Sequence, residues 1–214
     1  MVAVVKAAVN LMETGPETAA AKFAGRELLD PAVLAACQQG DHQAFTQLAE
    51  TYQDRIYSIA LRFSGNSATA KDIAQEVFLK LLSQICSFRG EASFDSWLYR
   101  LVVNCCLDHQ RRNWRWAPVL EDFVERFATR TAANRSALEN MLRGEIETQV
   151  GAAVAKLPAE LRVVVILRYT EGLSYDAIAQ IIGCPPGTVA SRLNRAHKLL
   201  ERRLTANRKY AGRE

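Results

Sequence analysis

The stretch Leu173–Leu204 constrains the fold most, because it specifies two short helices and the turn between them. Ser174 is suited to cap the first helix, since its hydroxyl can accept hydrogen bonds from backbone N–H groups of the following turn. Gly183 is typical of a helix end, and Pro185-Pro186 fix φ where a second helix can start. The pattern therefore predicts a helix-turn-helix from about Tyr175 to Asn194.

The second helix of this pair has an apolar side and a basic side. Its apolar residues recur at helical spacing: Val189, Leu193, Ala196, Leu200 and Leu204. From Pro186 onward there are eight Lys and Arg but two acids, a surplus of +6 in a chain whose net charge is +4. Such a concentration indicates DNA binding, although a solvated basic face is the plainer alternative. The side away from this apolar seam carries Ser191, Asn194, Arg195, Lys198 and Arg202.

The chain as a whole has the pattern of an all-α protein. Periodicity is helical nearly throughout its 214 residues, and no strand run with hairpin turns stands out. Five cysteines without C-x-x-C spacing argue against a disulfide framework or a zinc knuckle, so no metal or cofactor is expected. Polar residues interrupt the apolar N-terminus, and no run reaches transmembrane length. These features predict a soluble cytoplasmic protein without membrane insertion.

Breaks in the periodicity divide the chain into two small helical domains joined by a flexible linker. We expect an N-terminal extension of unassigned function at 1–29, a helical bundle at 30–113 and an acidic connector at 114–147. The helix-turn-helix domain follows at 148–206, and a basic tail at 207–214 ends the chain. The domain carrying the helix-turn-helix is expected to be separate from the bundle.

The predicted helix Ala70–Ile85 has an unusual outer face. Its core face consists of Ala74, Val77, Phe78, Leu81 and Ile85. The opposite face carries Asp72, Gln75, Glu76, Leu79 and Ser83. An apolar residue within a polar, acidic rim is typical of a protein docking site. A solvated face with one exposed leucine is the alternative, because single exposed leucines are common.

A loop and the helix after it carry a second candidate surface. The loop Ser87–Ser93 contains Phe88 and Arg89, and Ser93 can cap a helix Phe94–Arg112. One stripe of that helix differs from its apolar surroundings and holds Ser96, Arg100, Asn104 and Arg111, with Trp97 beside it. Aromatic rings beside cations suit single-stranded nucleic acid, whose bases stack while its phosphates meet arginine. The alternative is a buried tryptophan flanked by surface arginines.

Several of these segments, in this order, resemble the extracytoplasmic-function group of bacterial RNA polymerase sigma factors. The matching segments are G-D-H-Q-A-F at Gly40–Phe45, D-I-A-Q-E-V-F at Asp72–Phe78, the stretch Phe88–Asn104, L-P-A-E-L-R at Leu157–Arg162 and the stretch Gly172–Leu193. A helix-turn-helix alone is weak evidence, whereas this ordered combination is specific. The bundle then corresponds to region 2 of the family and the helix-turn-helix domain to region 4.

The resemblance implies partners for each surface. The face with Asp72, Gln75, Glu76, Leu79 and Ser83 would bind the β′ clamp of core RNA polymerase. Phe88, Arg89, Trp97, Arg100, Asn104 and Arg111 would engage the −10 element and capture a base turned out of the stack. The helix-turn-helix would bind the −35 element and also touch the β flap. Its DNA contacts would come from Gly187, Thr188, Ser191, Arg192, Arg195 and Lys198, with N–H groups near Gly187 and Thr188 available to a phosphate. An anti-sigma factor that buries the same surfaces is a further implied partner, whereas no small-molecule substrate is implied.

Two other classes of function fit the sequence less well. A free-standing helix-turn-helix regulator needs no docking face like that of Ala70–Ile85, and it usually dimerises on a palindrome. A nuclease would need a third metal ligand beside Asp72 and Glu76 or beside Asp108 and His109, and none stands at a suitable spacing. A non-enzymatic sigma factor is therefore the prediction. Ala190 departs from the Lys or Arg of many family members, so the −35 sequence cannot be carried over.

Overall fold

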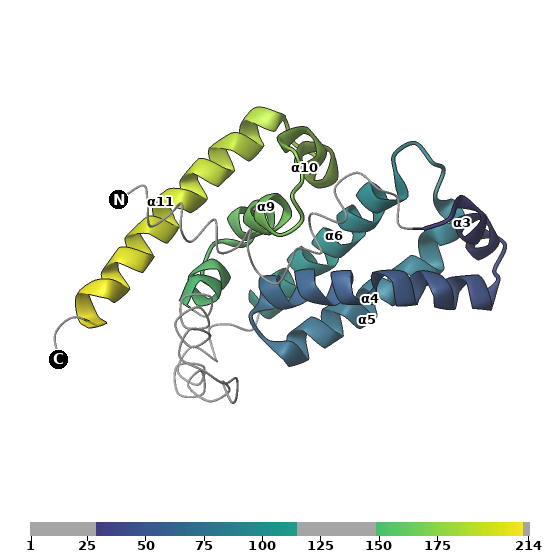
Figure 1. Ribbon diagram of the computed structural model, residues 1–214, viewed down its shortest axis with the longest axis horizontal. Coiled ribbons are helices and arrows are strands. Elements are labelled where there is room, and N and C mark those ends of the chain that lie inside the picture. The colour runs from purple at the N-terminus through teal and green to yellow at the C-terminus, as the bar shows by residue number, and fades with distance from the viewer. Residues whose placement is uncertain (1–28, 115–148, 212–214) are drawn as a thin grey trace.

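The computed structural model describes residues 29–114 and 149–211, which form helices joined by turns (Figure 1). The N-terminal unit consists of α3 (Pro31–Gln38), α4 (His42–Ser64), α5 (Ser67–Gln84), the short 3-10 helix η2 (Ile85–Ser87) and α6 (Phe94–Trp114). No strand occurs among the described residues, which confirms the all-α prediction. The expectations for residues 1–28 and 115–148 lie outside the described part of the chain.

Capping side chains set the starts of the first helices. The Asp41 carboxylate at the start of α4 accepts from the N–H groups of Gln43 at 2.8 Å and Ala44 at 3.3 Å. Asn66 caps α5 through a 3.1 Å bond from the Thr69 N–H. Between them, Gly65 ends α4 at φ 69°, a left-handed conformation that favours glycine.

The core of the N-terminal unit lies where α4, α5 and α6 meet. Its fully buried side chains include Leu48, Tyr52, Ile56, Ile73, Val77, Leu81 and Val102. The predicted α5 core face is confirmed, with Ile73 added to it and Phe78 only half-buried. Cys105 and Cys106 of α6 are buried in this core. Burial raises the pKa of the Cys106 thiol to about 12. All five cysteines of the chain are free thiols.

The C-terminal unit consists of a helical segment at 149–155, α9 (Ala159–Tyr169), α10 (Tyr175–Ile182) and α11 (Pro186–Ala211). The Ser174 hydroxyl caps α10 by accepting from the Ala177 N–H at 3.1 Å, and Gly183 ends that helix at φ 67°. The predicted α11 seam is buried, with Val189, Leu193 and Ala196 at 0%, 1% and 0% exposure. α11 continues past Leu204 to residue 211 and includes most of the predicted basic tail.

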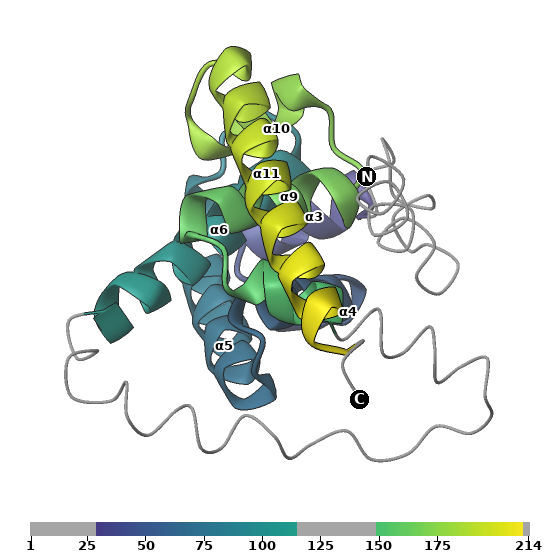
Figure 2. The same cartoon turned by 90° about the vertical axis from the view of Figure 1, so that its left-hand side faces the viewer.

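The two units pack against each other instead of standing apart. Figure 1 shows α9 between α11 and α6, and α9 contacts α4 and α6 while α10 contacts α6 (Figures 1 and 2). Seven consecutive residues of α9, Leu161–Leu167, are buried. An α-helix buried all round needs neighbours on opposite sides, so its own unit cannot cover it alone. The expectation of a C-terminal unit separate from the bundle therefore missed this contact.

A buried arginine crosses the same boundary. Arg162 of α9 is 8% exposed and donates to the Phe63 carbonyl oxygen of α4 at 2.5 Å and to the Leu157 carbonyl oxygen at 2.7 Å. Its guanidinium also lies 4.9 Å from the centre of the Phe63 ring. Burial lowers the pKa of Arg162, but a guanidinium titrates so high that it remains charged. Among the described helices, none combines the length and apolarity needed to cross a bilayer.

Candidate functional site

The outer face of α5 is exposed around two leucines. Leu79 is 62% exposed and Leu82 is 50% exposed, among the largest exposures of apolar side chains in the described residues. Asp72, Gln75 and Ser83 are exposed beside them. Leu82 was not among the residues predicted from the sequence, although it lies three residues after Leu79 and so shares its side of the helix. The face is therefore more apolar than the sequence indicated.

Glu76 is the exception on this face, because it is held by neighbouring cations. Arg112 of α6 donates two hydrogen bonds to its carboxylate, one of them at 3.4 Å, and Lys80 forms an ion pair with it at 3.1 Å. The hydrogen bond from Arg112 lowers the pKa of Glu76. Glu76 thus links α5 to α6, and a role in docking would require a partner to compete with Arg112.

The loop after η2 presents an aromatic cluster. The ring centre of Phe88 lies 5.5 Å from that of Trp97 and 5.6 Å from that of Phe94. Gln38 of α3 holds the loop through a 2.8 Å hydrogen bond from its side-chain nitrogen to the Phe88 carbonyl oxygen. The sequence gave no signal for Gln38, because this bond joins residues 50 positions apart.

An open hollow of about 470 Å³ adjoins this cluster, and we call it the aromatic hollow. Its lining includes Phe88, Arg89, Trp97, Arg100 and Gln180. The hollow therefore combines rings and cations, as the sequence predicted, but one edge comes from α10 of the other unit. Phe88 and Trp97 are half-buried and Arg89 is exposed. The alternative interpretation, a buried tryptophan flanked by surface arginines, is therefore only partly correct.

The remaining residues of the α6 stripe have different environments. Arg100 donates a 2.6 Å hydrogen bond to the Gln180 carbonyl oxygen. Asn104 is exposed, as is Arg111, which forms a 3.3 Å ion pair with Asp108 one turn away. The stripe therefore runs along one side of α6, and of its predicted members only Ser96 and Arg100, with Trp97 beside them, line the aromatic hollow.

The basic side of α11 is available over most of its length. Gly187, Ser191, Arg195 and Lys198 are exposed. Thr188 is half-buried, and its N–H donates to the Pro185 carbonyl oxygen at 2.9 Å. The expectation that the Thr188 N–H is free to hold a phosphate is therefore wrong, because this N–H is already hydrogen-bonded within the first turn of the helix.

Arg192 is less available than the sequence suggested. It is half-buried and forms a 3.1 Å ion pair with Glu160 at the start of α9. Glu160 is 70% exposed, so solvent screens the pair and its contribution to stability is small. A DNA phosphate can therefore compete for Arg192 at little cost.

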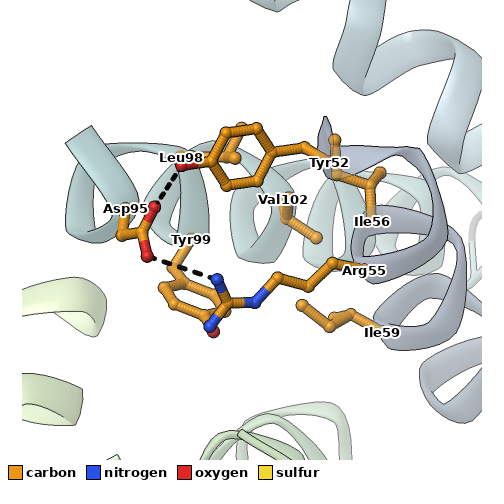
Figure 3. Close-up of a pocket in the computed structure, with 8 residues that line it drawn as sticks. All are labelled: Tyr52, Arg55, Ile56, Ile59, Asp95, Leu98, Tyr99 and Val102. Atoms are coloured by element: carbon orange, nitrogen blue, oxygen red, sulfur yellow. Dashed lines mark hydrogen bonds and ion pairs between the residues drawn. The ribbon is translucent and has the colours of Figure 1, made fainter. Parts of the chain in front are cut away.

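A buried polar network joins the two units and was not foreseen from the sequence. The Arg55 guanidinium of α4 binds Asp95 of α6 at 3.2 Å and Glu171 at 3.1 Å. Figure 3 shows Asp95 between Arg55 and Tyr52, whose hydroxyl donates to it at 2.5 Å. The hydroxyl of Tyr99 donates to Glu171 at 2.7 Å.

The network is sheltered from water. The side chains of Arg55 and Glu171 are 11% and 7% exposed. Burial, and then the nearby Glu171 carboxylate, raise the pKa of Tyr99, so its hydroxyl stays protonated and donates. Burial opposes the charge of Arg55, but its interactions with Tyr99 and Glu171 raise its pKa. Tyr99 and Arg55 therefore keep the protonation states that their hydrogen bonds require.

The acidic side chains of the described residues do not gather into a metal site. No group of three or more His, Cys, Asp or Glu side chains within residues 29–114 and 149–211 is placed to hold a metal ion. Asp72 is exposed, and Glu76 is engaged by Arg112 and Lys80. The described residues therefore present exposed side chains on α5 and α11 and an aromatic hollow beside α6.

Comparison with known families assigns both units. The family model of sigma-70 region 2 matches residues 48–115, and that of sigma-70 region 4 matches residues 147–200. Together these ranges cover more than half of the chain. Their order agrees with the order of the two units in the fold.

Curated relatives extend the match over most of the chain. The RNA polymerase sigma-H factor of Pseudomonas aeruginosa is 38% identical over 172 residues, which are 78% of this chain and 89% of that protein. The ECF RNA polymerase sigma-E factor of Haemophilus influenzae is 36% identical over 183 residues, with 83% and 96% covered. That of Escherichia coli K12 is 34% identical over 185 residues, with 83% and 95% covered.

The chain therefore belongs to the extracytoplasmic-function sigma factors of the sigma-70 family. It is an RNA polymerase sigma factor that directs promoter-specific transcription, and the free-standing regulator is not favoured.

Solved structures show the same fold. CnrH, in complex with the cytosolic domain of CnrY, superposes with a TM-score of 0.58 at 23% identity and covers 82% of this chain and 96% of that one. The sigma factor RpoE of Bartonella quintana, in complex with the anti-sigma factor NepR, gives a TM-score of 0.57 at 25% identity, with 75% and 96% covered. Both comparisons extend over the two units.

Proposed function

We propose that the two units divide promoter recognition between them. The N-terminal unit binds core RNA polymerase through α5 and holds the separated −10 strand in the aromatic hollow, while α11 binds the −35 duplex. The observation that carries this proposal is the aromatic hollow itself, where Phe88, Trp97 and Arg100 surround a space of about 470 Å³. Rings that stack on bases and a cation for phosphate are what capture of a single strand needs.

The exposed α5 face is the proposed contact with the β′ clamp. Leu79 and Leu82 supply apolar area, and Asp72, Gln75 and Ser83 supply a polar rim. An apolar centre within a polar rim is the usual composition of a protein interface. Glu76 contributes after exchanging Arg112 for a partner cation. The C-terminal unit is proposed to touch the β flap while it holds DNA.

Capture of the −10 element is proposed to begin with a base turned out of the duplex. Unstacking and unpairing one base costs a few kcal/mol. Stacking on Phe88 or Trp97 can return roughly 1–3 kcal/mol per base, and Arg89, Arg100, Asn104 and Arg111 hold the backbone. Gln38 fixes the Phe88 loop, so less conformational entropy is lost when the strand binds.

Recognition of the −35 element is proposed to use the exposed side of α11. Ser191 and Arg195 are placed to reach base edges in the major groove, while Lys198 and Arg192 neutralise phosphates. Arg192 exchanges Glu160 for the phosphate. The exposed Ala190 has no cation to offer, so the preferred −35 sequence differs from that of relatives with Lys or Arg at this position.

An anti-sigma factor is a proposed regulator of this protein. The support is the structural similarity to RpoE of Bartonella quintana, which was solved with the anti-sigma factor NepR. Such a partner would cover the α5 face or the α11 face. We propose that the protein acts in the cytoplasm, where bacterial RNA polymerase and DNA meet.

Run-off transcription tests the proposal directly. Purified protein is added to core RNA polymerase on a genomic promoter library, and the start sites are mapped. The expected result is initiation at a defined set of promoters, lost when Leu79 is changed to Asp and reduced when Phe88 is changed to Ala. Failure to initiate at any promoter, with antagonists absent, would contradict the proposed function.

A further inference from the structure

The C-terminal unit covers part of the face that the N-terminal unit presents to the −10 strand. α10 packs on α6, and the Gln180 carbonyl oxygen accepts the hydrogen bond from Arg100 at 2.6 Å. Gln180 also lines the aromatic hollow beside Phe88 and Trp97. A cation expected to bind a phosphate oxygen is therefore occupied by an oxygen of the protein itself.

Glu171 makes a second contact of this kind, with Arg55 of α4 and with Tyr99, the residue before Arg100 on α6. Its carboxylate oxygen accepts from the Arg55 Nε at 3.1 Å and from the Tyr99 hydroxyl at 2.7 Å. Asp95 binds the other side of Arg55 at 3.2 Å and comes from the N-terminal unit, as Arg55 and Tyr99 do. When Glu171 leaves, Asp95 still orients Arg55, and the Nε and the Tyr99 hydroxyl point towards a new acceptor.

Apolar contacts reinforce this contact between the units. Side chains of both units line a small gap in it: Ile59, Phe63, Val103 and Cys106 on one side, and Val163, Ile166 and Leu167 on the other. The Arg162 bond to the Phe63 carbonyl oxygen adds a polar tie. Near the end of α4, a Cβ added at Gly65 would lie 3.2 Å from the Ala155 Cβ, so the backbones approach closely there. The contact is thus a packed interface.

The two packed units do not extend far enough to contact both promoter elements at once. A compact chain of this size has a radius of gyration on the order of 15 Å. The −35 and −10 elements are about 25 base pairs apart, on the order of 80 Å at 3.4 Å per base pair. The two units must therefore separate before both can bind one promoter. The connection from residue 114 to residue 149 can extend on the order of 100 Å, which allows it.

We infer that Arg55, Tyr99 and Arg100 form a binding surface for the phosphodiester backbone of single-stranded DNA, which Glu171 and the Gln180 carbonyl occupy in the closed arrangement. Carboxylate, carbonyl and phosphate oxygens are all hydrogen-bond acceptors, and arginine binds phosphate strongly. The C-terminal unit and the DNA strand therefore compete for the same donors. This inference rests on the proposed −10 role of the α6 face, and it adds Arg55 and Tyr99 to that role.

Two substitutions open the interface in different ways. Glu171→Gln removes the charge that binds Arg55 and changes the shape little. Ala155→Trp places a bulky side chain opposite Gly65, where the units are close, and leaves the donors intact. Glu50→Gln is the control, because Glu50 is exposed on α4 and its loss changes the net charge by the same amount. Each variant is first checked for helical content and cooperative unfolding.

Small-angle scattering of the full chain measures the separation of the units without any assumption about DNA. A fluorescent 15-nucleotide mixed-pyrimidine single strand measures the phosphate surface by anisotropy. Glu171→Gln and Ala155→Trp are expected to increase the radius of gyration and to tighten strand binding by roughly threefold or more. Adding Arg55→Gln to either variant should remove the gain, and Glu50→Gln should match the parent protein.

The two measurements separate the possible failures. An increased radius without tighter binding would overturn the phosphate surface. An unchanged radius in both variants would overturn the competition between the units. If Glu171→Gln does not fold, Ala155→Trp alone decides the question. If Phe88→Ala leaves transcription intact while the expanded variants still bind the strand more tightly, the proposed −10 role of the aromatic hollow fails but the phosphate surface stands.

Discussion

The Tyr99 hydroxyl donates a 2.7 Å hydrogen bond to the Glu171 carboxylate, joining α6 to the turn between α9 and α10 across 72 positions of sequence. Arg55 shares the same carboxylate at 3.1 Å. A buried carboxylate with two donors from the other unit fixes how the units meet, because removing any partner leaves an unsatisfied polar group. The α6 surface that we propose for promoter binding is therefore coupled to the position of the helix-turn-helix.

Leu79→Ala on the exposed α5 face is expected to weaken binding to core RNA polymerase by about tenfold, or roughly 1–2 kcal/mol. The cause is lost apolar burial in the complex, and the free energy of unfolding should stay within about 0.5 kcal/mol because Leu79 is exposed. Fluorescence anisotropy with labelled sigma factor measures the affinity. Gln53→Ala, exposed on α4, is the control, and equal losses for both variants would argue against the α5 face.

Phe88→Ala is expected to reduce binding of a single-stranded −10 oligonucleotide to the holoenzyme by about tenfold, since stacking contributes roughly 1–3 kcal/mol per base. Binding of the intact −35 duplex should change less than about threefold, because α11 is untouched. Permanganate footprinting of the open complex checks the same step on a complete promoter. Equal losses for single strand and duplex would show that Phe88 supports the fold instead of the strand.

Arg195→Ala is expected to lower −35 duplex affinity and to reduce the slope of log affinity against log salt by about 0.9, the share of one phosphate contact. Arg192→Ala should have a smaller effect, since Arg192 first has to leave Glu160. Glu160→Gln should increase affinity where Arg192 is present and have no effect in the Arg192→Ala background. Salt titrations by anisotropy give these slopes, and an unchanged slope in Arg195→Ala would exclude a phosphate contact.

Arg162→Met is expected to destabilise the chain by roughly 2–4 kcal/mol, because the Phe63 and Leu157 carbonyls would lose their buried donor. Denaturant unfolding followed by circular dichroism measures this change. Arg202→Met, on the exposed side of α11, is the matched control and should change stability by less than about 0.5 kcal/mol. Similar values for the two variants would mean that the Arg162 bonds contribute no net stability.

His197 is expected to make stability depend on pH near neutrality. Burial lowers the pKa of His197 in the folded state, and its ring nitrogen lies 2.7 Å from the Tyr169 hydroxyl. The unfolded chain therefore takes up the proton more readily, so the stability of the fold is lost as pH falls through the unfolded value of about 6.5. Urea unfolding from pH 7.5 to 5.5 should show this loss in the parent and a weaker loss in His197→Gln. Parallel pH profiles would contradict the assignment.

The sequence predicted the helices because their signals are local. The caps at Asp41 and Ser174, the end at Gly183 and the buried seam of α11 all depend on residues within a turn or two of each other. The exposure of Leu79 was predicted for the same reason, since helical periodicity assigns each residue to a side. The exposure of Leu82 was not predicted, because a leucine near a core face does not by itself indicate exposure.

Contacts between distant segments could not be predicted in this way. Nothing in the residues around Glu171 indicates that Arg55 and Tyr99 will bind it. The residues around Arg162 likewise give no sign that its side chain is buried. The sequence by itself determined an all-α chain, the approximate extent of its helices and most of the exposed side chains of α5 and α11. Only the tertiary structure decided that α9 and α10 cover α6, because burial of a carboxylate depends on which donors long-range packing brings to it.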